Sequence, residues 1–168
     1  MPDHQKPPLL IIGIGNPFRS DDAAGLQAVR LLGDTGIDAS NLLEHSGEGA
    51  SLMEAWNGRT IVILIDAVSS GRPPGTIHRL EPLNDPLPAQ LFQSSTHAFS
   101  LPQAIEMSRA LGELPSRLMI FGIEGCNFQP GTELSPEVSA SLPKLAREVL
   151  NEVEKLKLDL QAGGELHA

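Results

Sequence analysis

The sequence is poor in cysteine, in positive charge and in long apolar runs, and each shortage excludes a class of protein. Cys126 is the single cysteine among 168 residues, so the chain can form neither an internal disulfide nor a cysteine zinc cluster. Its 12 Lys and Arg against 21 Asp and Glu give a net charge of -9, which argues against binding to nucleic acid or to an anionic membrane surface. The longest apolar runs are far too short to span a bilayer.

The first residues, "MPDHQKPP", also lack the charged-then-apolar form of a signal peptide, so we expect a cytoplasmic protein. No internal repeat and no linker interrupts the chain. We expect a disordered lead over residues 1–8, one α/β domain over 9–158 and a frayed tail over 159–168. Because no long apolar stripe would be left exposed, we expect a monomer.

Apolar runs alternate with helical patterns along the chain, and the main runs are apolar throughout. This alternation predicts an α/β fold, with a mostly parallel sheet sandwiched between helices. The expected strands are Leu9–Ile12, Ile37–Leu43, Thr60–Val68, an edge strand at Thr76–Leu80, and Arg117–Ile123. The expected helices are Asp22–Gly33, Ala50–Trp56, Leu101–Leu111 and Ser135–Leu158.

The opening stretch "LLIIGIGNPFRSDDAAG" suggests nucleotide binding, because an apolar strand leads into a glycine turn. Gly13 and Gly15 fit the dinucleotide fingerprint, but Phe18 stands where its third glycine belongs. The adjacent Asp21 and Asp22 would repel a pyrophosphate by several kcal/mol, on the order of the Coulomb energy at low dielectric. Nucleotide binding is therefore the weaker interpretation of this turn.

Parallel sheets place their sites at the carboxyl ends of strands, and this rule selects the residues to consider. Asp21 or Asp22 could cap the first helix, which leaves one acid of the pair unexplained. Asp66 follows "IVILI" at the end of a buried strand, where a carboxylate is costly unless it is paired or bound to a metal. His97, in "SSTHAFSL", follows a long proline-rich loop of the kind that is often functional.

Asp22, Asp66 and His97 together offer two carboxylates and one imidazole. Three protein ligands that leave positions open suit a catalytic or ligand-exchanging metal site, and nickel, zinc and iron(II) would all accept this set. His45 follows the second strand and is a reserve candidate. We expect His78 at the surface of the edge strand and Cys126 to be a loop or core thiol, because nothing nearby would lower the pKa of that thiol.

Four segments resemble, in order and spacing, the hydrogenase maturation proteases. They are "GIGNPFRSDDAAG", "LIDAV" followed by "GRPPGTIHRL", "SSTHAFSL", and "GIEG" with the later "LSPEV", and the resemblance runs from about Leu9 to Val153. Members of this family are the endopeptidases that trim the C-terminus of the large subunit of nickel–iron hydrogenase.

The resemblance implies a twisted, parallel-type sheet between helices, and a metal-binding and catalytic trio that falls on Asp22, Asp66 and His97. It also implies that the substrate is a nickel-loaded large-subunit precursor, so that the substrate itself presents the nickel, while zinc or another divalent metal stays open as a cofactor. The chain departs from the family at Ala23, where glycine is common, and at Asp22, where some members carry glutamate.

Two mechanisms fit this trio equally well. The metal could polarise the scissile carbonyl or lower the pKa of a bound water toward ~7. Alternatively it only docks the substrate, and Asp22 or Asp66 is the general base toward water. Two rival functions would use the same residues, a non-catalytic nickel or iron chaperone for hydrogenase assembly and a small-molecule metallohydrolase.

Overall fold

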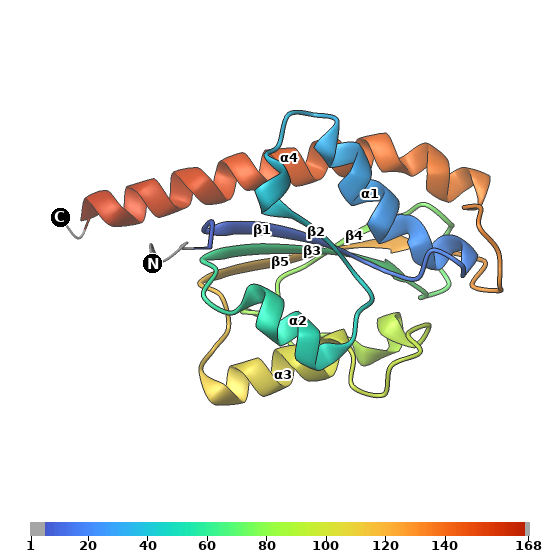
Figure 1. Ribbon diagram of the computed structural model, residues 1–168, viewed down its shortest axis with the longest axis horizontal. Coiled ribbons are helices and arrows are strands. Elements are labelled where there is room, and N and C mark those ends of the chain that lie inside the picture. Colours follow the sequence, from blue (N-terminus) through green and yellow to red (C-terminus); the bar gives the residue numbers. More distant parts are fainter. Residues whose placement is uncertain (1–5, 167–168) are drawn as a thin grey trace.

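A five-stranded sheet forms the centre of the protein, as a computed structural model that describes residues 6–166 shows (Figure 1). The strands are ordered β2-β1-β3-β5-β4. β2, β1, β3 and β5 are mutually parallel, and β4 is an antiparallel edge strand, which confirms the predicted fold class. Their bounds are β1 (Leu9–Ile14), β2 (Leu42–His45), β3 (Ile61–Val68), β4 (Ile77–Leu80) and β5 (Arg117–Glu124).

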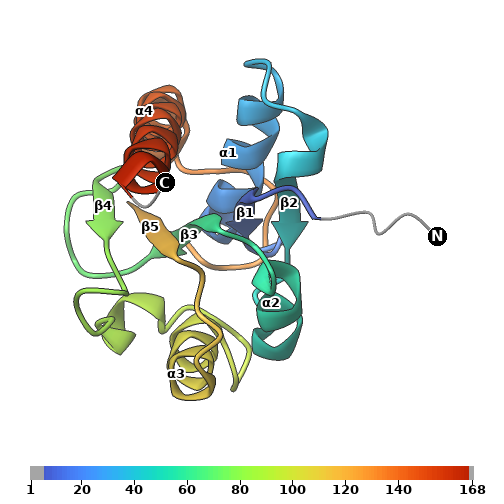
Figure 2. The ribbon, with the colours of Figure 1, turned by 90° about the vertical axis from the view of Figure 1, so that its left-hand side faces the viewer.

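Helices cover both faces of this sheet (Figure 2). α1 (Ala24–Gly33) and α4 (Pro136–Leu166) lie on one face, and α2 (Gly49–Trp56) and α3 (Leu101–Leu111) lie on the other. Every residue of β3 is buried, so its two side-chain rows enter separate apolar clusters, one beneath each helix pair. Burying each large aliphatic side chain stabilises the fold by roughly 1.5–3 kcal/mol, which explains why this strand shows no polar alternation.

Three segments differ from the expectation. The second strand begins only at Leu42, because residues 39–41 form the 3₁₀ turn η2 (Ala39–Asn41), with the Asp38 carboxylate accepting from the Ser40 amide at 2.8 Å. α4 continues to Leu166, where we expected fraying from residue 159. Pro8 at the end of the expected disordered lead accepts backbone hydrogen bonds from Thr60 and Ile61 at 3.0 and 2.9 Å. Residues 1–5 of that lead and the tail residues 167–168 lie outside the described part.

The glycines of the opening motif are needed for close packing. A Cβ on Gly13 would lie 2.2 Å from the carbonyl oxygen of Gly25, and a Cβ on Gly25 would lie 2.4 Å from that of Ile65. These contacts bring α1 directly against β1 and β3. The "GIG" pattern therefore has a packing explanation that needs no phosphate. Between residues 6 and 166, no helix combines the length and the apolar character that crossing a membrane requires.

The chain changes direction at β1. α1 follows β1 over one face of the sheet, whereas α2 leads from β2 to β3 over the other face. The connections therefore diverge between the carboxyl ends of β1 and β3. In open α/β sheets this topological switch point is where ligands bind.

Candidate functional site

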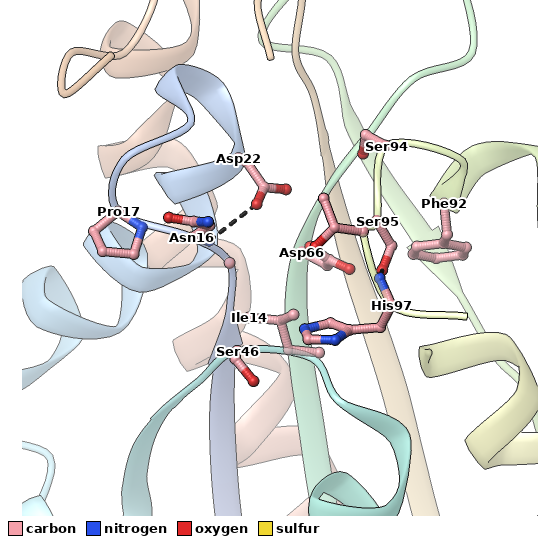
Figure 3. A pocket seen from close by; sticks show the side chains of 12 residues that line it. Ile14, Asn16, Pro17, Asp22, Ser46, Asp66, Phe92, Ser94, Ser95 and His97 are labelled. Atoms are coloured by element: carbon pink, nitrogen blue, oxygen red, sulfur yellow. Dashed lines mark hydrogen bonds between the residues drawn. The ribbon is translucent and has the colours of Figure 1, made fainter. Parts of the chain in front are cut away.

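A pocket of about 220 Å³ opens at this switch point (Figure 3). Its walls come from the loop after β1, from β3, and from the segment that precedes α3. The pocket is lined by all three predicted site residues, Asp22, Asp66 and His97. The first and second of these lie more than 40 positions apart in the sequence, and the second and third lie 31 apart. The structure thus brings the three predicted site residues to one cavity.

Asp22 reaches the pocket because the chain passes very close to Gly15. A Cβ on Gly15 would lie 2.0 Å from the carbonyl oxygen of Asp22, so no other residue fits there without a shift of the backbone. Asp22 Oδ2 accepts a hydrogen bond from the Asn16 amide at 2.9 Å and lies 3.8 Å from Arg19 Nη1. Burial nevertheless raises the pKa of the Asp22 carboxyl, although Asn16, Arg19 and His97 each oppose that rise.

Asp66 enters the pocket from β3, two residues before the strand ends at Val68. Its side chain is almost wholly withdrawn from water. Burial first, and then the negative charge of Asp22, raise the pKa of the Asp66 carboxyl well above its ordinary value, against a hydrogen bond from the Ala67 amide. Two buried carboxyls that repel each other make a site that favours a proton or a cation.

His97 lies across the pocket from Asp22, on the segment between η3 (Ala89–Phe92) and α3 (Figure 3). Its positive charge, when the ring is protonated, lowers the pKa of Asp22, so the imidazole and that carboxylate are electrostatically linked. In the part of the chain that the structure covers, no three His, Cys, Asp or Glu side chains are close enough together to hold a metal ion. The trio lines one cavity without forming a closed cage.

Asp21 turns the other way, into a junction between the β1 loop and the loop after β5. Its carboxylate accepts hydrogen bonds from the amides of Cys126, Asn127 and Ser135 at 2.9, 2.9 and 2.7 Å, and from the Ser135 hydroxyl at 2.8 Å. Burial raises the pKa of Asp21, but the bonds from Ser135, Cys126 and Asn127 outweigh burial and leave this pKa lowered.

The expected helix cap is therefore wrong for both acids. The residue that precedes α1 is Ala23, and α1 has no side-chain cap. Asp21 and Asp22 lie in the preceding 3₁₀ turn η1 (Ser20–Ala23). The Asp21 carboxylate accepts from distant amides, and the Asp22 carboxylate accepts from the amide of Asn16 in the same loop. The sequence carried no signal for the role of Asp21, because its partners are more than 100 positions away.

The remaining candidates lie outside the pocket lining. His45 Nδ1 accepts from the Gly47 amide at 2.9 Å, and burial lowers the pKa of this ring. His78 is not at the surface as expected, because its Nε2 lies 3.2 Å from Oε1 of the buried Glu124. Glu124 also accepts from the Ser70 amide at 2.7 Å and so fixes the loop after β3. Cys126 is exposed, with its Sγ 3.1 Å from the Ser135 hydroxyl.

Two buried carboxyls and an imidazole around one cleft of an α/β sandwich are the parts of a hydrolytic enzyme. The family model described as "Hydrogenase maturation protease" matches residues 34–152, a span that includes Asp66 and His97 and begins after Asp22. The chain belongs to the hydrogenase maturation proteases, and it is an enzyme of the peptidase class.

Individual relatives agree with this assignment. The hydrogenase 2 maturation protease of Escherichia coli K12 is 30% identical over 147 residues, which cover 84% of this chain and 88% of the relative. The hydrogenase expression/formation protein HupD of Thiocapsa roseopersicina is 29% identical over 79% of this chain, and the match spans only 61% of that relative's length.

Solved structures also share the fold. The hydrogenase maturating endopeptidase HybD from E. coli superposes with a TM-score of 0.73 at 26% identity, over 88% of this chain and 92% of that one. The [NiFe] hydrogenase maturation protease HybD from Thermococcus kodakarensis gives a TM-score of 0.61 at 28% identity, over 86% and 97% of the two chains.

Proposed function

We propose that this protein is a cytoplasmic endopeptidase that removes the C-terminal extension of a nickel–iron hydrogenase large-subunit precursor after nickel insertion. The observation that carries the proposal is the meeting of Asp22, Asp66 and His97 in one pocket at the switch point of the sheet. Membership of a protease family supports cleavage over a non-catalytic chaperone role. The relatives named as hydrogenase maturation proteases support the choice of substrate.

The chemistry of the pocket suits nickel that arrives with the precursor. Carboxylate oxygens and an imidazole nitrogen are ligands that nickel accepts. Burial raises the pKa of both acids, and the Asp66 pKa is raised further by Asp22, so a divalent cation between them would relieve unfavourable negative charge. In the described part of the chain no three such side chains lie close enough together to hold an ion by themselves, so in this proposal the precursor supplies both the nickel and its remaining ligands.

Each residue then has a defined task. Asp22 and Asp66 offer oxygens from the sheet side of the pocket, and His97 offers a nitrogen from the opposite wall. Bound nickel would supply a positive charge that can polarise a neighbouring carbonyl. Whichever of Asp22 and Asp66 is not engaged by the cation can accept the proton of the attacking water, because its raised pKa brings it nearer to neutral pH.

The test is the intact mass of the hydrogenase large subunit from source cells that lack this gene. Cells complemented with the wild type should contain the trimmed subunit, and cells complemented with His97→Ala should keep the C-terminal extension. A subunit that matures normally without the gene would contradict the proposal. A subunit that stays untrimmed and nickel-free in the absence of the gene, but is trimmed once nickel is supplied in excess, would indicate the chaperone instead.

A further inference from the structure

Residues 93–98, here called the His97 segment, make few hydrogen bonds to the rest of the described chain. Their hydrogen bonds within the neighbourhood are local, from the Ser95 amide to the Phe92 carbonyl at 3.1 Å and from the His97 amide to Ser95 Oγ at 3.3 Å. Throughout residues 6–166, the one hydrogen bond that joins this segment to a distant part of the chain comes from Arg19, whose Nη1 donates to the Ser94 carbonyl at 2.8 Å.

Both ends of the His97 segment are held, because the Leu91 carbonyl accepts from the Ser69 amide at 3.0 Å and the Phe99 carbonyl accepts from the Gly49 amide at 2.9 Å, whereas its middle borders two cavities. The pocket of about 220 Å³ lies against the His97 segment, and a second hollow of about 370 Å³, lined by Gln90, Gln93 and Gln103 among others, also borders it. Ser95 and His97 line both cavities. Between these two ends, the bond from Arg19 is the segment's one hydrogen bond to a distant part of the described chain, and its charged donor makes it a strong one.

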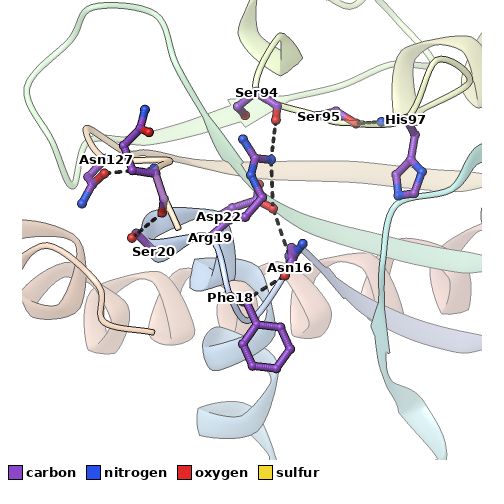
Figure 4. Close-up of polar contacts among 10 residues, drawn as sticks. Asn16, Phe18, Arg19, Ser20, Asp22, Ser94, Ser95, His97 and Asn127 are labelled. Atoms are coloured by element: carbon purple, nitrogen blue, oxygen red, sulfur yellow. Dashed lines mark hydrogen bonds and ion pairs between the residues drawn. The ribbon is translucent and has the colours of Figure 1, made fainter. Parts of the chain in front are cut away.

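Arg19, in contrast, comes from a firmly held turn. The Arg19 amide donates to the Asn16 carbonyl at 3.3 Å, and the next residue, Ser20, donates its amide to the Gly131 carbonyl at 3.0 Å. Ser20 Oγ adds a bond to the Gln129 carbonyl at 2.8 Å. The guanidinium thus extends from a fixed base, past Asp22 at 3.8 Å, to Ser94 on the other wall of the pocket (Figure 4).

We propose that Arg19 is a positioning residue that holds the His97 segment across the pocket from Asp22, so that the imidazole and the carboxylate face each other before any substrate arrives. The inference rests on the proposed function only for what the pair then binds. The ion pair with Asp22 is partly exposed and at 3.8 Å contributes little, so the hydrogen bond to Ser94 carries the effect. Arg19 acts through His97 and does not touch the reacting atoms.

Amide hydrogen exchange of the purified protein gives the first test. Arg19→Met should speed exchange in residues 93–98 by roughly tenfold or more, as expected for the loss of a charge-assisted hydrogen bond, and leave β1, β3 and β5 unchanged. Arg109→Met is the matched control, because Arg109 Nη2 donates in the same way to the Pro82 carbonyl at 2.6 Å, in a different loop. Unchanged exchange in residues 93–98 of Arg19→Met would overturn the proposal.

The NMR resonance of the His97 ring proton between the two nitrogens gives the second test, at a fixed pH of about 8. Asp22→Asn should shift this resonance in the wild type and leave it in place in the Arg19→Met background, because the ring no longer faces Asp22. An equal shift in both backgrounds would show that Arg19 does not position His97. Neither test uses a hydrogenase precursor, so failure here and failure of the proposed function are separate results.

Discussion

Asp21 and Asp22 are neighbours in the chain and lie in two regions of opposite character. Asp21 is completely buried and receives four hydrogen bonds, so its pKa is lowered despite burial. Asp22 is nearly as buried but receives one hydrogen bond, from Asn16, and its pKa is raised. The junction around Asp21 supplies enough hydrogen-bond donors to its carboxylate, whereas the pocket around Asp22 leaves that carboxylate short of donors.

Within a single turn, one acid therefore stabilises the fold and the other is available to bind a ligand. A buried carboxylate with several donors stabilises the loops that it joins. A buried carboxylate with few donors costs stability and persists where a ligand uses it. Asp66 belongs with Asp22 by this criterion, since its pKa is raised by burial and by the charge of Asp22.

The largest predicted effect is on processing. Asp66→Asn and Asp22→Asn should each slow removal of the precursor extension by about 1000-fold or more, the scale expected when a general base or metal-facing carboxylate is lost. The mass of the precursor over time measures the rate. Asp34→Asn, which changes an exposed acid at the end of α1, should process at the wild-type rate. Normal processing by Asp66→Asn would remove this residue from the site.

Asp66→Asn should also not destabilise the protein at neutral pH. A folded-state pKa above the ordinary 3.8 means that the protonated acid suits the fold, so the contribution of Asp66 to wild-type stability is greatest below pH 3.8 and is lost as the pH rises through the raised pKa. Asparagine has no proton to lose. Urea unfolding should therefore show an advantage for Asp66→Asn at pH 7 that shrinks toward pH 4, and a variant less stable than wild type at pH 7 would contradict this account.

In contrast to the Asp66 and Asp22 variants, Asp21→Ala should mainly lower the stability of the protein. Its removal leaves the amides of Cys126, Asn127 and Ser135 without their acceptor, at a cost of about 3 kcal/mol in the free energy of unfolding. Because the folded-state pKa is lowered, the wild-type contribution is present above pH 3.8 and is lost as the pH falls through the lowered value.

Urea unfolding of wild type and Asp21→Ala across pH measures both parts of this prediction. The gap between the two should be largest near neutral pH and narrow on acidification. An equal gap at pH 3 and pH 7 would mean that the charge of Asp21 does not contribute. A stable Asp21→Ala that fails to process would place Asp21 in the site and erase the contrast with Asp22.

The sequence predicted the sheet well because strands depend on local signals, and it selected three residues that the fold brings to one pocket. Apolar runs such as Thr60–Val68 indicate buried strands, and the carboxyl-end rule selects Asp66 from the many acids. The trio came also from the resemblance of four segments. The roles of Asp21 and Arg19 could not be predicted, because each depends on backbone groups 75 or more positions away that only the folded chain brings near.

Gly15→Ala should displace Asp22, the acid that faces the pocket, through a steric clash alone. The added methyl would meet the Asp22 carbonyl at 2.0 Å, so the backbone must move, at a cost of about 1–3 kcal/mol. The displaced Asp22 should lower the processing rate as well. Gly163→Ala is the control, since a Cβ there meets nothing within 4 Å and alanine favours the helix. Gly15→Ala with wild-type stability would show that the backbone of this turn can shift at little cost in free energy.

Ser20→Gly should have the smallest effect, although Ser20 directly precedes the two acids and has a positive φ. Its φ of 50° lies in the left-handed region, which costs a non-glycine residue about 1 kcal/mol. Glycine removes that strain but loses the bond from Ser20 Oγ to Gln129, so the two changes offset to within about 1 kcal/mol. Ser20→Ala loses the bond and keeps the strain, and should therefore be less stable than Ser20→Gly in urea. The opposite order would mean that the positive φ of Ser20 costs less free energy than the extra chain entropy that glycine loses on folding.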